Sequence, residues 1–327
     1  MMLRICLLLL TGQLWLPLGS LAYAQDVEAA ESGTHLDEVL VTGQRGGPRL
    51  WKVSSGEREL WILGVLDPVP KNMQWHSQEV MTLLNESQEV LMDRTSVSPD
   101  ANLFGKVGLY LQWRRMQKNP DGRTLEDVLP PDVYARFAAL EKRYDAGADL
   151  YRLRPIMAAA RLYRRAVSSV GLDSRRPVPK QVEKLARQHN LKPKTISVKV
   201  TEPREALNAL NSISPDAEVR CLDATLRSLE TDLGVLTERA NAWALGDVAA
   251  LRALLAENEH SACWDVVLGI PRVKELSATA DRQWLESAES ALERNRTTLA
   301  LRSMRDLLSP DGILTQLRAR GYQVVGP

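Results

Sequence analysis

The stretch LWKVSSGERELWILG, residues 50–64, predicts how the fold begins. Two apolar runs, 50–53 and 60–63, flank the turn-forming residues 54–57. Short apolar runs on either side of a Ser/Gly turn are typical of a β-hairpin. We therefore expect two paired antiparallel strands at the start of a sheet.

The residues that follow the hairpin extend it into an α/β layer. A helical pattern over 75–84 comes after a Pro-rich bend, and a short apolar strand, 89–93, comes next. The order strand–helix–strand favours an α/β architecture.

The centre of the chain has mainly helical patterns, and the end returns to an α/β pattern. Apolar stripes after Pro residues predict helices, and strict alternation over 194–200 predicts a half-buried strand. Gly246 is expected to end a long helix and Asp247 to cap the next one. The other expected elements are helices at 132–144, 156–170, 181–189, 217–245, 284–294 and 312–320, and strands at 298–301 and 322–325. We expect an α/β fold whose mixed sheet is built from N- and C-terminal α/β units, with a large helical insert.

The first 24 residues have the pattern of a secretory signal peptide. Arg4 precedes an apolar stretch, and residues 22–24 (Ala-Tyr-Ala) have the small-x-small pattern that signal peptidase recognises. We expect cleavage after Ala24 and export to the periplasm. The alternative, a retained membrane anchor, is disfavoured because the uninterrupted apolar run is short for a membrane span.

The rest of the chain is expected to comprise a flexible N-terminal segment, residues 25–48, and one domain, residues 49–327. Charges are almost balanced over the full 327 residues, with 42 Lys+Arg and 41 Asp+Glu. Nucleic-acid binders and polybasic membrane proteins need a sustained positive field. We therefore expect no nucleic-acid partner, and no membrane anchor after removal of the signal.

Export changes the interpretation of the cysteines. Cys221 and Cys263 remain after the signal is removed. An even pair in an oxidising compartment is more often a disulfide than two reactive thiols. We expect a Cys221–Cys263 disulfide, with two buried free thiols as the alternative.

The common catalytic motifs are absent, and a series of arginines is present. The chain has no HExxH, GxSxG, Walker, GxGxxG or CxxC motif. An acidic polysaccharide could use the arginines, although a solvated helix face is the simpler interpretation. The series comprises Arg152, Arg154, Arg161, Arg164, Arg165, Arg175 and Arg176.

Several segments together resemble the TraB/PrgY/GumN family, and the exported GumN-like branch fits best. The similarity runs in order from residue 49 to 327. It implies a fold related to Tiki metalloproteases and, more distantly, to erythromycin esterase-like proteins, with metal-dependent hydrolase ancestry and two Gly-x-x-His motifs. The segments are 50–53, 60–64, 70–73 (Pro-Lys-Asn-Met), 240–247 (ANAWALGD), 293–295 (Glu-Arg-Asn) and 311–324.

Both histidines that the resemblance implies are replaced. The first motif reads Gly64-Val65-Leu66-Asp67, and the second reads Ser303-Met304-Arg305-Asp306. The acidic position on the second strand is Met92-Asp93. The candidate site at the family's motif positions therefore comprises Gly64, Asp67, Asp93, Arg294, Asn295 and Asp306.

Two interpretations of this site follow. Asp67, Asp93 and Asp306 could form an oxygen site for manganese, magnesium or calcium, in a divergent metal-dependent peptidase or hydrolase. In the other interpretation the metal site has decayed, because carboxylates without a cation repel each other. We favour the second interpretation: a non-catalytic protein without a cofactor, which binds a peptide, a protein or an acidic envelope polysaccharide.

Overall fold

The computed structural model describes residues 47–327, apart from 74, 76–77, 232 and 257–260. The expected signal peptide and nearly all of the expected flexible segment lie outside the described residues. The described residues belong to one compact unit. Among the described helices, none combines the length and the apolar character that a membrane span requires.

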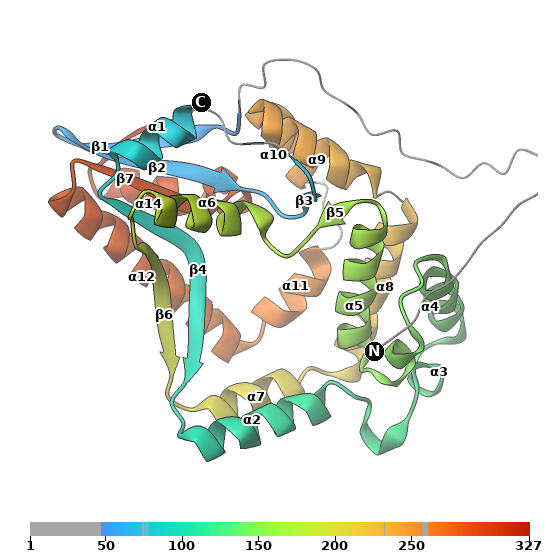
Figure 1. Ribbon diagram of the computed structural model, residues 1–327. Helices are drawn as coiled ribbons and strands as arrows, with labels where there is room; N and C mark the ends of the chain where they lie inside the picture. The colour runs from blue at the N-terminus through green and yellow to red at the C-terminus, as the bar shows by residue number, and fades with distance from the viewer. Residues whose placement is uncertain (1–46, 74, 76–77, 232, 257–260) are drawn as a thin grey trace, which may run out of the picture. The chain divides into compact units, whose positions relative to one another are not determined.

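A six-stranded mixed sheet forms the centre of this unit (Figure 1). β1 and β2 form the predicted antiparallel hairpin, in which Gly56 has a φ of 61° at the tight turn. β7 lies between β2 and β4 and is parallel to both. The predicted N- and C-terminal units therefore share one sheet. Its order is β6 (Pro193–Val200), β4 (Glu89–Pro99), β7 (Thr297–Ser303), β2 (Arg58–Val65), β1 (Leu50–Ser55) and β8 (Gln323–Val325).

Strand β4 is longer than predicted and has a bulge. Its pairing with β6 shifts register between Leu91 and Thr95. Beyond the bulge, β4 and β6 continue as a pair past the rest of the sheet towards α2 (Leu103–Met116) and α7 (Pro203–Asn211) (Figure 1). The strand predicted at 89–93 thus extends to Pro99. A second, two-stranded sheet joins β3 (Val69–Pro70) to β5 (Leu172–Asp173).

Helices surround the sheet and form a separate bundle beside it. α1 and α6 pack on one face of the sheet and α12 on the other (Figure 1). Six of the described α-helices begin with a proline, whose fixed φ suits the first turn. The helices are α1 (Gln78–Glu86), α2 (Leu103–Met116), α3 (Leu125–Val128), α4 (Pro131–Arg143), α5 (Pro155–Ser169), α6 (Pro177–Gln188), α7 (Pro203–Asn211), α8 (Pro215–Thr231), α9 (Gly234–Leu245), α10 (Val248–Ala256), α11 (Ser261–Leu268), α12 (Pro271–Arg294), α13 (Met304–Leu308) and α14 (Ile313–Ala319).

Three helical predictions need correction. The single helix predicted over 217–245 is two helices, α8 and α9. α6 begins at Pro177, earlier than the predicted start at residue 181. α2 was not predicted at all. The expected end at Gly246 and the Asp247 cap are confirmed, since Gly246 has a φ of 71° and Asp247 Oδ1 accepts a bond from the Ala250 N–H at 2.9 Å.

Two apolar cores stabilise the unit. The larger core surrounds the sheet and includes the fully buried rings of Trp243 and Trp284. The smaller core lies within the helical bundle and includes Phe137 of α4. Cys221 of α8 and Cys263 of α11 form the predicted disulfide in this second core.

Candidate functional site

Three parallel strands bring the predicted carboxylates to one edge of the sheet. β2, β7 and β4 run in the same direction, and the carboxyl ends of β2 and β7 lie near the point where β4 stops pairing with β7, after Leu91. Asp67 follows β2, Asp93 lies at the bulge in β4, and Asp306 follows β7. Ligand sites of α/β proteins form at this edge because the loops that follow the strands meet there.

Gly64 is required by close packing in β2. Its carbonyl oxygen accepts a hydrogen bond from the Trp243 indole N–H at 2.7 Å. A Cβ at this position would overlap the sulfur of Met304 and would lie 3.0 Å from the Trp51 ring. Side chains of neighbouring residues therefore fill the space beside Gly64, the first residue of the first motif.

Asp93 forms an ion pair with Arg176 at the start of α6. Arg176 Nη2 lies 2.8 Å from Asp93 Oδ2 and 2.5 Å from the Asp93 carbonyl oxygen. The bulge allows the strand to turn this side chain towards α6, as bulges next to functional sites often do. Burial raises the pKa of Asp93 to about 6, although the positive charges of Arg176 and Arg302 oppose the rise.

Arg176 itself has an unusual backbone conformation. Its φ of 57° lies in the left-handed region, which non-glycine residues rarely adopt. It also precedes Pro177, the first residue of α6. Such conformations cost about 1–3 kcal/mol and concentrate at functional sites. The position of the Arg176 side chain between the strand ends is therefore imposed by the surrounding structure.

Asp67 lies in the turn that leaves β2, before a cis Asp67–Pro68 peptide bond. The residue as a whole is exposed, but nearby protein atoms exclude part of the water around its carboxylate. This desolvation raises the pKa of Asp67 to about 6. The charge and the backbone N–H of Arg176 oppose the rise, and the charge of Asp173 adds to it. Asp67 and Asp93 therefore share Arg176 as a positive neighbour.

Asp306 forms an ion pair with another arginine, Arg302, which is buried. Arg302 Nε lies 2.5 Å from Asp306 Oδ2, and Arg302 Nη2 lies 2.5 Å from Asp281 Oδ1 of α12. The guanidinium carbon also lies 5.1 Å from the centroid of the Trp284 ring. The Asp306 N–H donates to the Ser303 hydroxyl, which caps α13. Asp306 is thus fixed both as a first-turn residue and as an ion-pair partner.

Two of these three carboxylates have an arginine partner. Within the described residues, no group of three or more His, Cys, Asp or Glu side chains has an arrangement that could hold a metal ion. Arg176 and Arg302 place permanent positive charge beside Asp93 and Asp306, and this charge opposes the approach of a cation. We derive no catalytic step through a metal.

Arg294 and Asn295 lie elsewhere. Arg294 Nη2 and Asn295 Nδ2 each lie 3.1 Å from Glu89 Oε2, at the start of β4. Asn295 Nδ2 also donates to the Thr298 hydroxyl at 3.1 Å. The structure therefore places these two residues at the amino ends of the strands. They fix the entry of β4 and β7 into the sheet, and they do not meet Asp67, Asp93 or Asp306.

A basic pocket of about 500 Å³ lies beside the strand ends. Arg161, Arg164 and Arg165 of α5 line it together with Lys71 and Arg175. The three α5 arginines are three and four residues apart, so they share one face of the helix. Two carboxylates also line the pocket, which leaves three positive charges uncompensated. The complete lining is Lys71, Ala146, Asp149, Leu150, Arg161, Arg164, Arg165, Ser168, Leu172, Asp173, Ser174 and Arg175.

Two arginines of this pocket are free to bind a ligand. Arg161 pairs with Asp149 at 2.5 Å, and Arg175 pairs with Asp173 at 2.9 Å. The exposed side chains of Arg164 and Arg165 have no ion pair or hydrogen bond to another residue in the described part of the chain. Asp173 lines this pocket, and its negative charge helps to raise the pKa of Asp67 at the end of β2. The pocket therefore lies close to the strand ends.

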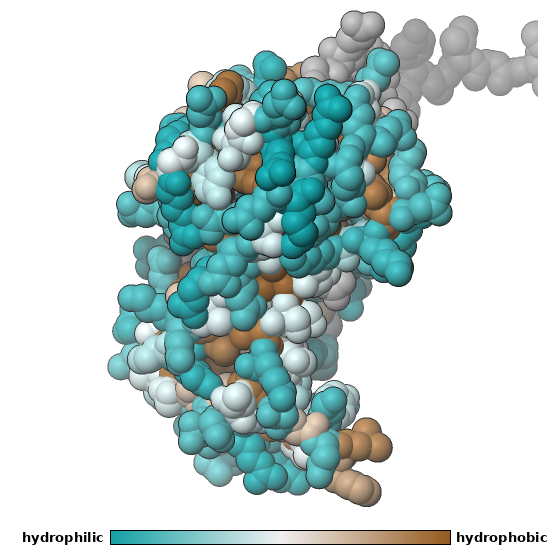
Figure 2. All heavy atoms as spheres, turned by 90° about the vertical axis from the view of Figure 1, so that its left-hand side faces the viewer, coloured by the Kyte–Doolittle hydropathy of each residue, from teal (hydrophilic) through white to brown (hydrophobic). Residues whose placement is uncertain are grey.

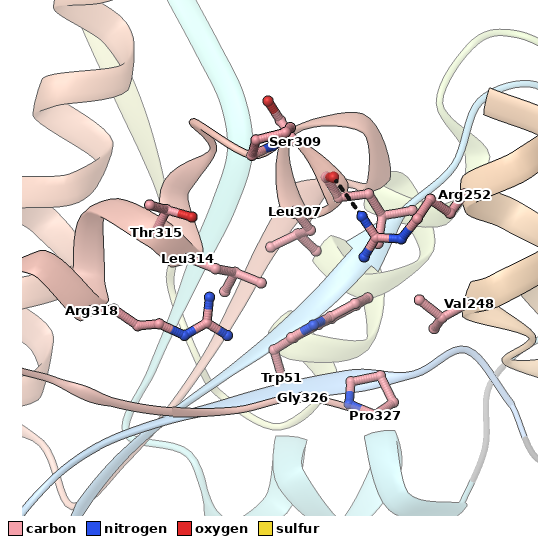
Figure 3. A pocket seen from close by; sticks show the side chains of 12 residues that line it. Trp51, Val248, Arg252, Leu307, Ser309, Leu314, Thr315, Arg318, Gly326 and Pro327 are labelled. Carbon is pink, nitrogen blue, oxygen red and sulfur yellow. Dashed lines mark hydrogen bonds between the residues drawn. The ribbon is translucent and has the colours of Figure 1, made fainter. Parts of the chain in front are cut away.

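A second pocket, of about 420 Å³, lies on the other side of Trp51 (Figure 3). The Trp51 ring forms part of its wall and also packs against Gly64. Arg252 enters from α10 and donates to the Leu308 carbonyl oxygen at 3.1 Å (Figure 3). Trp51, which the sequence places in the opening Leu-Trp pair, thus separates this pocket from the first motif.

The sequence did not identify the partners of the three carboxylates. Arg176 was included only as a member of the arginine series, and Arg302 follows the predicted strand 298–301 without a motif. Arg154, also in that series, is buried and pairs with Glu218 at 2.8 Å through its Nε. Apart from the exposed Arg152, the series therefore divides into internal ion pairs and residues that line the basic pocket.

Comparison with known proteins gives one match. A family model described as the TraB/PrgY/gumN family matches residues 49–325. No curated protein and no solved structure matches the chain.

Proposed function

The chain belongs to the TraB/PrgY/gumN family, and from that premise we propose that it is an exported, non-catalytic member that binds an acidic polysaccharide. The observation that carries the non-catalytic part is the position of Arg176 and Arg302. Each places a guanidinium group against a carboxylate at the strand ends. A guanidinium is a permanent cation, so it neutralises the carboxylates without a metal.

The basic pocket supports the choice of ligand. Its volume of about 500 Å³ lies within the usual range of ligand pockets. Planar guanidinium groups such as those of Arg164 and Arg165 bind carboxylate and sulfate groups through paired N–H donors. A polysaccharide that carries uronic acids presents such groups at regular intervals. The Cys221–Cys263 disulfide supports the exported location, since disulfides persist in oxidising compartments.

The ligand is tested by titration calorimetry with polygalacturonate, with neutral dextran and polyglutamate as comparison polymers. We expect binding of polygalacturonate that weakens with rising salt and is lost in the Arg164→Gln/Arg165→Gln variant. The matched control is Arg114→Gln/Arg115→Gln, which removes two adjacent arginines from α2, away from the pocket. Binding of dextran, a preference for polyglutamate, or equal losses in both variants would contradict the polysaccharide proposal.

The non-catalytic part is tested separately by metal analysis and hydrolysis assays. Elemental analysis of the exported protein, purified without chelators, is expected to find no stoichiometric manganese, zinc, magnesium or calcium. Peptidase and esterase assays with these ions are expected to give the same rates for wild type and Asp67→Ala. Metal-activated hydrolysis that disappears in Asp67→Ala would overturn the proposal that the protein is non-catalytic.

A second candidate, the divergent hydrolase, has one observation in its favour. Asp67 and Asp93 both have a pKa of about 6, near the range in which carboxylates act as general acids or bases. Pairs of groups with perturbed pKa values are common in active sites, although structural ion pairs also produce them. The hydrolysis assay above distinguishes the two functions. If the protein is a hydrolase, its rate of hydrolysis falls on substitution of Asp67 or Asp93, and if it is a binding protein, there is no such rate to lose.

A further inference from the structure

Helix α2 exposes a row of large apolar side chains. Leu103 and Phe104 are 73% and 85% exposed, and Val107, Tyr110 and Leu111 are 51–56% exposed. Figure 2 shows hydrophobic side chains protruding at the end where Figure 1 places α2 and α7. Soluble domains rarely expose so many neighbouring apolar groups unless another surface covers them.

The exposed residues form one face of the helix. Leu103, Val107 and Tyr110 recur at intervals of four and three residues, and Leu111 lies beside them. The opposite face is the one that packs on the protein. It includes buried Leu109 and Gln112, whose Nε2 donates to Asn208 Oδ1 of α7 at 3.0 Å. The apolar face therefore points away from both cores.

Positive charges frame this apolar face. At 3.6 residues per turn, Lys106 borders it on one side, Arg115 borders it on the other, and Arg114 continues it at the last turn. No Asp or Glu occurs between Ala101 and Pro120, although charges balance over the whole chain. None of these three cations has an ion pair within the described residues.

We propose that α2 is a docking surface for a membrane that contains anionic phospholipids. An apolar face framed by cations is the arrangement of helices that lie in the plane of a bilayer, because the apolar groups enter the acyl boundary while the cations meet the phosphates. The position of α2 beyond the sheet, at the end of the extended β4–β6 pair, gives it access to a flat surface (Figure 1). The charge surplus favours an anionic bilayer over a second copy of the chain, which would bring the same cations together.

The experiment is cosedimentation of the full chain with vesicles of phosphatidylglycerol and phosphatidylcholine, compared with phosphatidylcholine alone. We expect binding to the anionic vesicles that falls with rising salt and is lost in Phe104→Asp. The Arg114→Gln/Arg115→Gln variant is expected to bind roughly 30-fold more weakly, since each cation near an anionic surface contributes about fivefold. Wild type and variants have the same N-terminal segment. A difference in vesicle binding between them therefore arises from the substitutions in α2.

Two matched controls separate α2 from general attraction. Arg164→Gln/Arg165→Gln removes the same charge from α5, and Val325→Asp places the same acid at another exposed apolar residue, which is 62% exposed. Both are expected to bind vesicles like wild type, and thermal melting checks that Phe104→Asp is folded.

Three results would overturn the proposal. The first is no binding to anionic vesicles at low ionic strength. The second is an equal loss of binding in the two arginine pairs. The third is a dimer, found by sedimentation velocity, that Phe104→Asp dissociates, since this would assign the face to a second copy.

Discussion

Replacement of Asp93 by asparagine is expected to stabilise the protein at neutral pH and to leave its stability unchanged near pH 4. Burial raises the pKa of Asp93 from 3.8 to about 6 in the folded protein. Its side chain is only 17% exposed, so solvent screens the effect little. The folded state therefore binds the Asp93 proton more tightly than the unfolded state does.

The direction and size of the effect follow by linkage. Because the folded pKa is the higher one, the protonated carboxyl contributes full stability below about pH 4, and this is lost as the pH rises to about 6. A rise from 3.8 to about 6, at about 1.4 kcal/mol per pH unit, corresponds to about 3 kcal/mol. Asparagine resembles the protonated carboxyl at every pH and can still accept a hydrogen bond from Arg176.

The assay is urea denaturation, followed by tryptophan fluorescence at pH values from 4 to 8. The stability of Asp93→Asn minus that of wild type should be near zero at pH 4, should rise between pH 4 and 6, and should remain at about 3 kcal/mol above that. Asp311→Asn, at an exposed carboxylate, should show no such rise. A variant that becomes less stable than wild type as the pH rises would refute the reasoning, since the Asp93–Arg176 pair would then outweigh desolvation.

Three further predictions concern packing, ion pairing and the disulfide. Gly64→Ala should cost about 1–3 kcal/mol by overpacking against Met304, and Met304→Ala in the same chain should recover part of that loss, as double-mutant denaturation curves would show. Glu218→Ala should cost about 3–5 kcal/mol because it leaves Arg154 buried without its partner, whereas a loss below about 1 kcal/mol would mean that water reaches the arginine. Cys221→Ser should lower the free energy of unfolding by about 4 kcal/mol by opening a loop of 42 residues, and reducing agent should then have no further effect.

Local patterns in the sequence predicted the sheet well. The hairpin, the alternating strand β6 and the last strand β8 are visible because each alternates or is bounded by turn residues. α2 was missed because its apolar residues lie on the solvent side as well as the protein side, so no stripe stands out. The end of β4 was missed because Thr95 and Ser96 are polar and pair only with distant β6.

The candidate site was predicted only in part. The family resemblance gave Asp67, Asp93 and Asp306, and the structure brings their strands together. It could not give Arg176 or Arg302 as their partners, because ion pairs between distant elements leave no local spacing. Arg294 and Asn295 were placed in the same group by resemblance, yet they lie at the other end of the strands.

The place of β7 in the sheet has a consequence for the newly made chain. β7 joins β2 to β4, but it is synthesised after the entire helical insert. Until Thr297–Ser303 has left the ribosome, the two earlier strands have no neighbour to connect them, and the native sheet cannot close. Formation of the complete sheet must therefore follow synthesis of β7. A premature stop before Thr297 would remove the middle of the sheet, and what remained would expose unpaired strand edges prone to aggregation.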